Sequence, residues 1–299
     1  MEIAISILAI LLILWFVVGF IIFNLSLKSR EKNSLFKKDG EEKRPVDVGC
    51  AKYYKQERIT GSDGISLNGY YAYSTQNNPW VICIHGYGGK ATGMVEYTEM
   101  FRNLGMNVLT VDLRGHGDSQ GNYYTLGVHD SDDVILWADW LKESFKADKI
   151  ILFGISMGGA TVLMAAAKKS ELFSIVISDS APSDFNRMFM RILKHRMGSI
   201  AHLFMPMLYL YTRIFAGYSL KDASAGEYVS QISIPTLYIH GQSDGLVPLE
   251  MMTELYEKST CQKERFVMQG AEHTGAIKKN KDLYLRTVSD FMQRTVYKI

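Results

Sequence analysis

Ser156 lies in a Gly-x-Ser-x-Gly sequence, residues 154–158, between a strand-like run and a helix-like run. The run before it, residues 150–153, is Ile-Ile-Leu-Phe, and the run after it, residues 160–167, is rich in alanine. Between a strand and a helix this pattern forms a tight elbow that lifts the serine hydroxyl above a sheet. Glycine is needed at its ends because side chains there would collide with neighbouring backbone. The pattern favours a nucleophilic serine over a plain glycine-rich turn.

A base and an acid follow Ser156 in the order that such a serine requires. A serine hydroxyl is a poor nucleophile until a base removes its proton. His273 follows the last expected strand, and Asp244 follows the strand before it. The chain order serine, acid, histidine is that of a strand–elbow–helix architecture. We expect His273 to take the proton and Asp244 to hold the imidazole tautomer and stabilise the imidazolium.

Residues 85–89, His-Gly-Tyr-Gly-Gly, follow another apolar run and could stabilise an oxyanion. Small residues there allow backbone N–H groups to point into a site. We expect the N–H groups of Tyr87 and Met157 to donate hydrogen bonds to the oxyanion, since one donor must come from the residue just after the nucleophile. His85 is expected to be a structural hydrogen-bonding residue rather than a base.

The other histidines and the cysteines predict no further site. His116 is expected to shape the loop 112–119, and His240 to face the core or cap a strand, while three more have no supporting neighbours: His129, His195 and His202. The cysteines, Cys50, Cys83 and Cys261, lack the C-x-x-C spacing of a zinc site and do not form a disulfide framework. No metal and no cofactor are expected.

The pattern of apolar runs past residue 53 is that of alternating strands and helices. Strands are expected at residues 57–60, 67–73, 80–84, 108–111, 150–153, 175–177, 236–239 and 266–268. Helices are expected at residues 92–104, 128–145, 157–169, 249–258 and 281–296. Most strand runs are continuously apolar, as in a parallel sheet covered on both faces. The prediction is one doubly wound, mostly parallel α/β domain over residues 53–299.

The motifs together resemble those of the α/β-hydrolase superfamily. They are His85-Gly86-x-Gly88-Gly89, Asp112-x-Arg114-Gly115-His116-Gly117-x-Ser119, the elbow at Ser156, Asp244-x-x-Val247-Pro248 and Gly270-x-x-His273. The resemblance implies an eight-stranded fold, the triad Ser156, Asp244 and His273, and no cofactor. With its N-terminal segment, the chain also looks like bacterial membrane-linked hydrolases grouped with prolyl-oligopeptidase-like and cinnamoyl-esterase-like enzymes.

The N-terminal segment predicts a membrane anchor at residues 1–25. Residues 3–23 carry no charge, and about 20 apolar residues in a helix cross a hydrocarbon core of roughly 30 Å. A cleaved signal peptide is disfavoured because no basic residue precedes the apolar run and no A-x-A cleavage pattern follows it. A buried core helix is disfavoured because the run is apolar on all sides. Basic residues gather only after it: Lys28, Arg30, Lys32, Lys37, Lys38, Lys43 and Arg44. The positive-inside rule predicts a single-pass cell-membrane protein with a cytoplasmic catalytic domain, joined by a polar linker at residues 26–52.

A long segment between the strands at 175–177 and 236–239 predicts a helical cap at about residues 183–230. Its middle, residues 185–218, is rich in methionine and aromatic side chains, which suit an apolar acyl or aromatic substrate or simply pack as a cap. Four basic residues argue against its burial in lipid, namely Arg187, Arg191, Lys194 and Arg213.

Composition limits the class of function. Hydrophobic residues make up 47%, charged residues 21% and the net charge is +2, which is ordinary for a globular body and gives no basic surface for nucleic acid. The leading hypothesis is a serine hydrolase that cleaves an ester or related acyl bond of a small molecule through an acyl-enzyme. An aminopeptidase-like amide hydrolase and a non-catalytic binding protein of the same fold remain alternatives.

Overall fold

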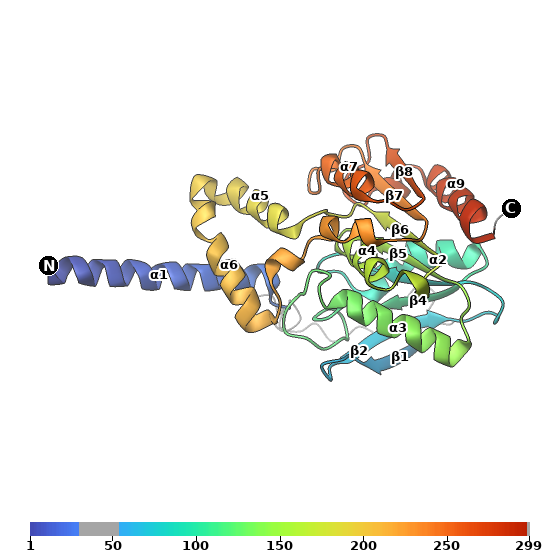
Figure 1. The fold of residues 1–299 in the computed structure, drawn as a ribbon, viewed down its shortest axis with the longest axis horizontal. Coiled ribbons are helices and arrows are strands. Elements are labelled where there is room, and N and C mark those ends of the chain that lie inside the picture. Colours follow the sequence, from blue (N-terminus) through green and yellow to red (C-terminus); the bar gives the residue numbers. More distant parts are fainter. Residues whose placement is uncertain (30–53, 298–299) are drawn as a thin grey trace, which may run out of the picture.

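The computed structural model describes residues 1–29 and 54–297. Most of the expected polar linker, residues 26–52, and Cys50 lie outside the described residues. The chain begins with a long helix, α1 (Glu2–Leu27), which projects from one end of a compact body (Figure 1). The expected anchor therefore forms a helix that extends two residues past its predicted end.

The body is built on one eight-stranded sheet, mostly parallel, as the sequence predicts. Its order is β1-β2-β4-β3-β5-β6-β7-β8, and only the pairs β1–β2 and β2–β4 are antiparallel. The strands are β1 (Lys55–Thr60), β2 (Ser66–Ala72), β3 (Trp80–Ile84), β4 (Asn107–Val111), β5 (Ile150–Ile155), β6 (Ile175–Asp179), β7 (Thr236–Gly241) and β8 (Lys263–Met268). Five central strands, β3 to β7, are buried along their length apart from Ile155, which explains their continuous apolar runs.

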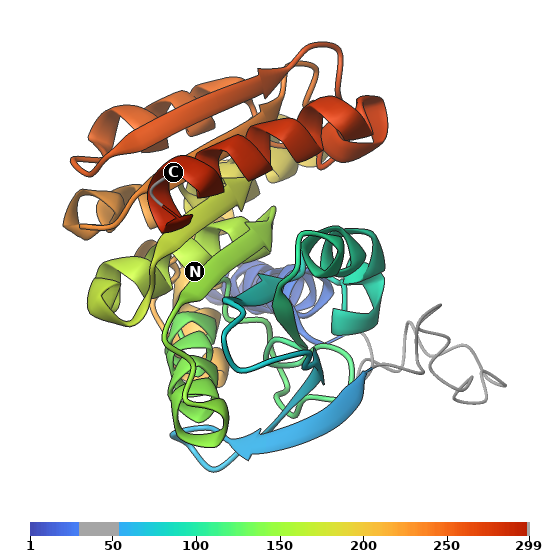
Figure 2. The ribbon, with the colours of Figure 1, turned by 90° about the vertical axis from the view of Figure 1, so that its right-hand side faces the viewer.

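Helices cover both faces of the sheet and enclose two cores (Figure 2). One face carries α3 (Asp130–Phe145), α4 (Met157–Lys168), η2 (Ser170–Leu172) and α7 (Leu249–Lys258). The other face carries η1 (Ala91–Met94), α2 (Val95–Asn103), α8 (Ala276–Lys279), α9 (Lys281–Met292) and η8 (Gln293–Tyr297). The segment 92–104, expected as one helix, begins as the tighter turn η1, where Gly93 lowers the preference for an α-helix.

The cap consists of short helices inserted between β6 and β7. They are α5 (Phe185–Met197), η3 (Gly198–Leu203), α6 (Met205–Tyr211), η4 (Thr212–Ala216), η5 (Leu220–Asp222), η6 (Ala225–Glu227) and η7 (Val229–Gln231). Asp184 caps α5 by accepting hydrogen bonds from the N–H groups of Asn186 and Arg187. The outer part of the cap, from α5 to η4, extends from the body toward α1 (Figure 1).

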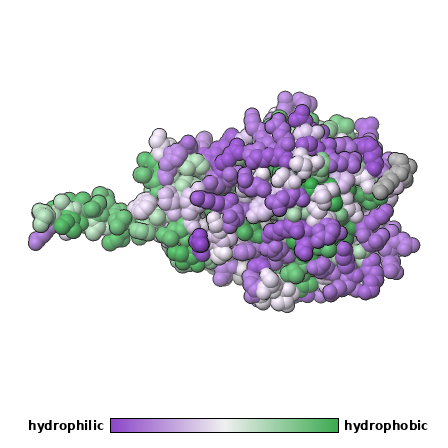
Figure 3. All heavy atoms as spheres, in the orientation of Figure 1, coloured by the Kyte–Doolittle hydropathy of each residue, from purple (hydrophilic) through white to green (hydrophobic). Residues whose placement is uncertain are grey.

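The second half of α1 packs on the cap, while its first half is exposed. Trp15 Nε1 donates to the carbonyl of Leu203 at 2.8 Å, and Phe23 and Leu27 are fully buried. Within the described residues α1 is the one helix whose length and composition would allow it to cross a membrane. Hydrophobic atoms cover its projecting part (Figure 3).

Candidate functional site

Ser156 occupies a strained turn between β5 and α4. Its φ is 53° and its ψ is −119°, a conformation that costs a non-glycine residue free energy and clusters at functional sites. Its N–H donates to the carbonyl of Asp179 at 2.8 Å. The two glycines of the elbow have no room for a side chain: a Cβ on Gly154 would lie 2.2 Å from the carbonyl oxygen of Gly158, and one on Gly158 would lie 2.3 Å from that of Ile84. The sequence pattern therefore folds locally as an elbow.

The structure brings the three predicted side chains into one hydrogen-bonded row. His273 Nε2 lies 2.9 Å from Ser156 Oγ, and His273 Nδ1 lies 2.7 Å from Asp244 Oδ2. Ser156 follows β5, Asp244 follows β7 and His273 follows β8, so the carboxyl ends of parallel strands gather them at one edge of the sheet. This geometry can move the serine proton onto an imidazole held in one tautomer by a carboxylate.

Asp244 is held as a carboxylate by its hydrogen bonds. Its other oxygen, Oδ1, accepts from the N–H groups of Leu246 at 2.9 Å and Val247 at 2.8 Å. Burial by itself would raise the pKa of Asp244, but the hydrogen bond and charge of His273 and the N–H of Val247 outweigh it and lower the pKa. His240 is buried beside it and bonds to the carbonyl of Val247, so it supports the turn that carries Asp244.

A second buried acid, Asp179, lies near the site and was not singled out from the sequence. It ends β6, and burial raises its pKa to about 6. Its carboxylate accepts from Tyr284 Oη at 2.9 Å and Ser180 Oγ at 2.8 Å, while Ser180 Oγ accepts from the N–H of Thr274, the residue after His273. The signal in the sequence was its position two residues after the apolar run 175–177. Asp179 thus supports the loop that carries His273 through Ser180. In the described part of the chain, it has no hydrogen bond to the His273 imidazole.

The loop at residues 86–89 begins beside the nucleophile. A Cβ on Gly86 would lie 3.2 Å from Ser156 Cβ, and the N–H of Gly88 donates to His116 Nε2 at 3.2 Å. Met157 begins α4, whose first N–H groups have no partner inside the helix. Gly86 and Met157 therefore lie next to Ser156. That the N–H groups of Tyr87 and Met157 hold an oxyanion stays a prediction.

His85 and His116 hold this loop in place. His85 Nε2 accepts from the N–H of Leu113 at 3.1 Å, and His116 stacks on Tyr124 with ring centroids 3.9 Å apart. Both are buried, so neither is placed to act as a general base on a substrate. Of the histidines without supporting neighbours, His129 bonds to the carbonyl of Gly217 at 3.3 Å, and His195 and His202 are exposed.

The end of α1 joins the loops of the site, which the sequence did not indicate. The Tyr87 hydroxyl donates to the carbonyl of Ser26, and the N–H of Tyr124 donates to the carbonyl of Leu27 at 2.8 Å. Ser29 Oγ donates to the carbonyl of Gly115 at 2.5 Å. The apolar helix and the loop expected to hold the oxyanion are therefore parts of one packed unit.

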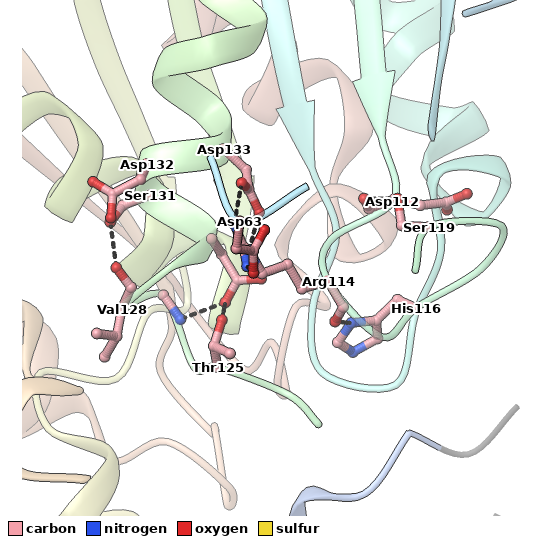
Figure 4. A network of polar contacts seen from close by, with 12 residues as sticks. Asp63, Asp112, Arg114, His116, Ser119, Thr125, Val128, Ser131, Asp132 and Asp133 are labelled. Carbon is pink, nitrogen blue, oxygen red and sulfur yellow. Dashed lines mark hydrogen bonds and ion pairs between the residues drawn. The ribbon is translucent and has the colours of Figure 1, made fainter. Parts of the chain in front are cut away.

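A buried ion-pair network fixes the loop 112–119 (Figure 4). Arg114 donates to both carboxylate oxygens of Asp133 on α3, one at 2.7 Å, and to Asp63. The Arg114 and Asp133 side chains are 7% and 4% exposed, whereas Asp63 is half exposed. Burial raises the pKa of Asp133, and the hydrogen bonds and charge of Arg114 oppose that rise. The network connects the loop of His116 to the helix layer.

We expect Arg114→Met to lower the free energy of unfolding by about 3–5 kcal/mol, because it leaves Asp133 buried without a cation. The loss should shrink on acidification: a buried carboxyl with a raised folded-state pKa destabilises the fold as pH rises and is tolerated when protonated. Urea denaturation at pH 5 and pH 8 measures both effects. Asp63→Asn, at the exposed end of the network, should cost less than about 1 kcal/mol. Equal losses for the two variants would contradict the burial argument.

The cysteines form no site in the described part of the chain. Cys83 is fully buried in β3, where burial raises the pKa of its thiol, and Cys261 is partly buried. Among residues 1–29 and 54–297, no three His, Cys, Asp or Glu side chains are grouped as a metal site would need.

Known proteins resemble this chain in sequence and fold. A family model described as "alpha/beta hydrolase fold" matches residues 79–200, and one described as "Serine hydrolase (FSH1)" matches residues 187–276. The chain is 27% identical over 236 residues to the uncharacterized protein YqkD of Bacillus subtilis, covering 78% of this chain and 77% of YqkD. It is 26% identical over 190 residues to the lysophosphatidylserine lipase ABHD12 of Danio rerio, covering 60% of this chain and 47% of ABHD12. The esterase Pf2001 of Pyrococcus furiosus superposes with a TM-score of 0.67 at 26% identity, covering 81% of this chain and 92% of the esterase.

Proposed function

We propose that this chain, which belongs to the α/β-hydrolase superfamily, cleaves an ester or related acyl bond of a small molecule through an acyl-enzyme on Ser156. The observation that carries the proposal is the row of hydrogen bonds from Asp244 through His273 to Ser156. A hydroxyl, an imidazole and a carboxylate in this order activate a serine for acyl transfer.

In the proposed reaction, Ser156 Oγ attacks the substrate carbonyl carbon while its proton passes to His273 Nε2. The N–H groups of Tyr87 and Met157 stabilise the oxyanion, and Asp244 stabilises the imidazolium. His273 then gives the proton to the leaving alcohol or amine as the bond to the acyl carbon breaks. A water molecule then attacks the acyl carbon while His273 Nε2 takes its proton. The bond between the acyl carbon and Ser156 Oγ breaks, the acid leaves, and His273 returns the proton to Oγ. No step requires a metal or a cofactor.

An ester substrate with an apolar acyl group is favoured over an amide. Pf2001 is named an esterase and ABHD12 a lysophosphatidylserine lipase, and both resemble the chain at 26% identity. The methionine- and aromatic-rich cap, residues 185–218, supports an apolar acyl group, since methionine adapts to varied apolar shapes. An aminopeptidase-like amide hydrolase is the second candidate, supported only by the chemistry that both reactions share. Comparing kcat/KM for p-nitrophenyl esters of increasing chain length with that for aminoacyl p-nitroanilides decides between them.

A fluorophosphonate probe tests the activity against the alternative of a non-catalytic binding protein. The probe phosphonylates an activated serine, so the wild type should be labelled and Ser156→Ala should not. Labelling that persists in Ser156→Ala would contradict the nucleophile assignment. Absence of labelling in the folded wild type would favour the binding protein.

We also propose that α1 anchors the protein as a single pass in the cell membrane, with the hydrolase domain, residues 53–299, in the cytoplasm. The length and composition of α1 and the basic residues after it support this topology. A reporter fused to the C-terminus should be active only in the cytoplasm. A reporter signal from the outer side would reverse the orientation.

A further inference from the structure

Large apolar side chains are exposed on the part of the cap that adjoins α1. They are Ile200, Leu203, Leu210, Ile214 and Phe215, carried by η3, α6 and η4. Single exposed apolar residues are ordinary on a protein surface, but a group of them beside an apolar helix marks an interaction surface. Figure 3 shows hydrophobic atoms continuing from α1 onto the adjoining part of the body. We call these five residues the cap patch.

The contacts between α1 and the cap fix the position of the cap patch along the helix. Trp15 Nε1 donates to the carbonyl of Leu203 at 2.8 Å, and Tyr211 Oη donates to the carbonyl of Phe16 at 2.9 Å. A Cβ on Gly19 would lie 2.6 Å from Met207 Cβ, so α6 approaches the backbone of α1 closely. The cap therefore lies beside α1 from residue 15 onward.

The length of α1 then sets the depth of the cap in a bilayer. A span needs about 20 residues to cross roughly 30 Å of hydrocarbon. Residues 3–14, which precede the cap contacts, cover only about 18 Å at 1.5 Å per residue. The hydrocarbon must also include much of residues 15–23, and the cap elements packed there lie at the same depth.

The charges on the outer cap fit the surface of a bilayer. Residues 185–218 include no acidic residue, whereas they include five basic ones: Arg187, Arg191, Lys194, Arg196 and Arg213. Arg187 pairs with Glu254, and Arg191 donates to the carbonyl of Gly245, so these two face the body. The other three are exposed, and their long side chains can carry their charges up to phosphate headgroups. These charges were expected to exclude the segment from lipid. Because two of them face the body and the others can reach the headgroups, they limit the depth of the cap instead.

We propose that η3, α6 and η4 are immersed in the same membrane leaflet as the second half of α1, with the cap patch against acyl chains and the basic residues at the headgroups. The occupant of this surface is lipid hydrocarbon. The inference rests on the proposed anchoring by α1, and the experiment below separates the two.

Depth-dependent quenching tests the inference with the full-length protein in vesicles of phosphatidylcholine and phosphatidylglycerol. Cys50→Ser and Cys261→Ser leave Cys83, which is fully buried, and an environment-sensitive NBD label is attached to Leu203→Cys or Ile214→Cys. These two side chains are 59% and 60% exposed, so a label there disturbs little packing. Both labels should be quenched by lipids that carry doxyl groups on their acyl chains. Quenching is compared only among labelled variants that keep p-nitrophenyl ester turnover, which shows that they are folded. Quenching of the label at one of the two cap positions is enough to support the inference.

Two reference positions make each outcome decisive. Ile10→Cys, on the exposed first half of α1, should be quenched. Gln293→Cys should not, because the exposed Gln293 begins η8, the last element before the C-terminus, and the C-terminus lies at the end of the molecule opposite α1 (Figure 1). We expect quenching at the cap positions to reach at least about half of that at Ile10. Quenching at Ile10 alone would leave the anchor standing and overturn the immersion of the cap. Absence of quenching at Ile10 would overturn the anchor and the inference together.

Discussion

Ser156→Ala should reduce kcat for a short p-nitrophenyl ester by about 10⁴–10⁶-fold while the protein stays folded. Loss of the nucleophile removes the acyl-enzyme route, and only binding and the oxyanion donors remain to accelerate hydrolysis. The fold should persist because alanine keeps the Cβ and adds no volume at the strained turn, where φ is 53°. Steady-state kinetics and circular dichroism measure the two effects.

A serine outside the candidate site provides a control for the effect of replacing any serine with alanine. Ser74 is exposed, and its N–H rather than its hydroxyl donates to Asn107 Oδ1 at 2.7 Å. Ser74→Ala should therefore retain wild-type turnover. If Ser156→Ala retained a tenth or more of wild-type kcat, the acyl-enzyme on Ser156 would have to be abandoned.

Asp244→Asn should reduce kcat by about 10⁴-fold, because an amide facing His273 Nδ1 favours the wrong imidazole tautomer and offers no charge to the imidazolium. The carboxylate is the form present at neutral pH: burial would raise the pKa of Asp244, but its bonds to His273 and Val247 lower it. The change preserves side-chain volume and the acceptor for the N–H groups of Leu246 and Val247. Kinetics at pH 7–9 measure the loss.

Asp179→Asn is the corresponding control for a second buried acid. Asp179 bonds to Tyr284 and Ser180 instead of the imidazole, so an amide there should lower kcat by less than about tenfold, far short of the loss expected for the triad acid. A loss equal to that of Asp244→Asn would mean that the acid at the end of β6, rather than the one after β7, serves His273. The two variants therefore assign the acid by experiment.

The hydrogen bonds between α1 and the loops of the site mean that removal of α1 would disturb these loops. Tyr87 bonds to the carbonyl of Ser26, and Tyr124, on which His116 stacks, bonds to the carbonyl of Leu27. Removing α1 would take away both partners and expose Tyr211 and Met207 on the cap, which are now buried against α1. Kinetic work on the full-length protein avoids that change.

The sequence determined the strands, the helices and the chain order of the candidate site. The strand at 80–84 and the helix at 249–258 were predicted to the residue, because apolar periodicity and flanking turn residues act over a few positions. The mostly parallel character of the sheet also follows from local patterns. Ser156, Asp244 and His273 could be grouped because parallel strands end at one edge, although His273 is 117 residues from Ser156 along the chain.

Only the tertiary structure decided which buried groups meet. Asp179 and Asp244 both follow apolar strands in the sequence, but only Asp244 lies 2.7 Å from His273, a separation set by how two distant loops pack. The same holds for α1: composition determined an apolar helix, whereas its docking against α6 through Gly19 and Met207 depends on the fit of two surfaces far apart in the chain. Short-range patterns carry periodicity and turn chemistry, while these contacts arise from close packing of residues distant in sequence, which no local pattern encodes.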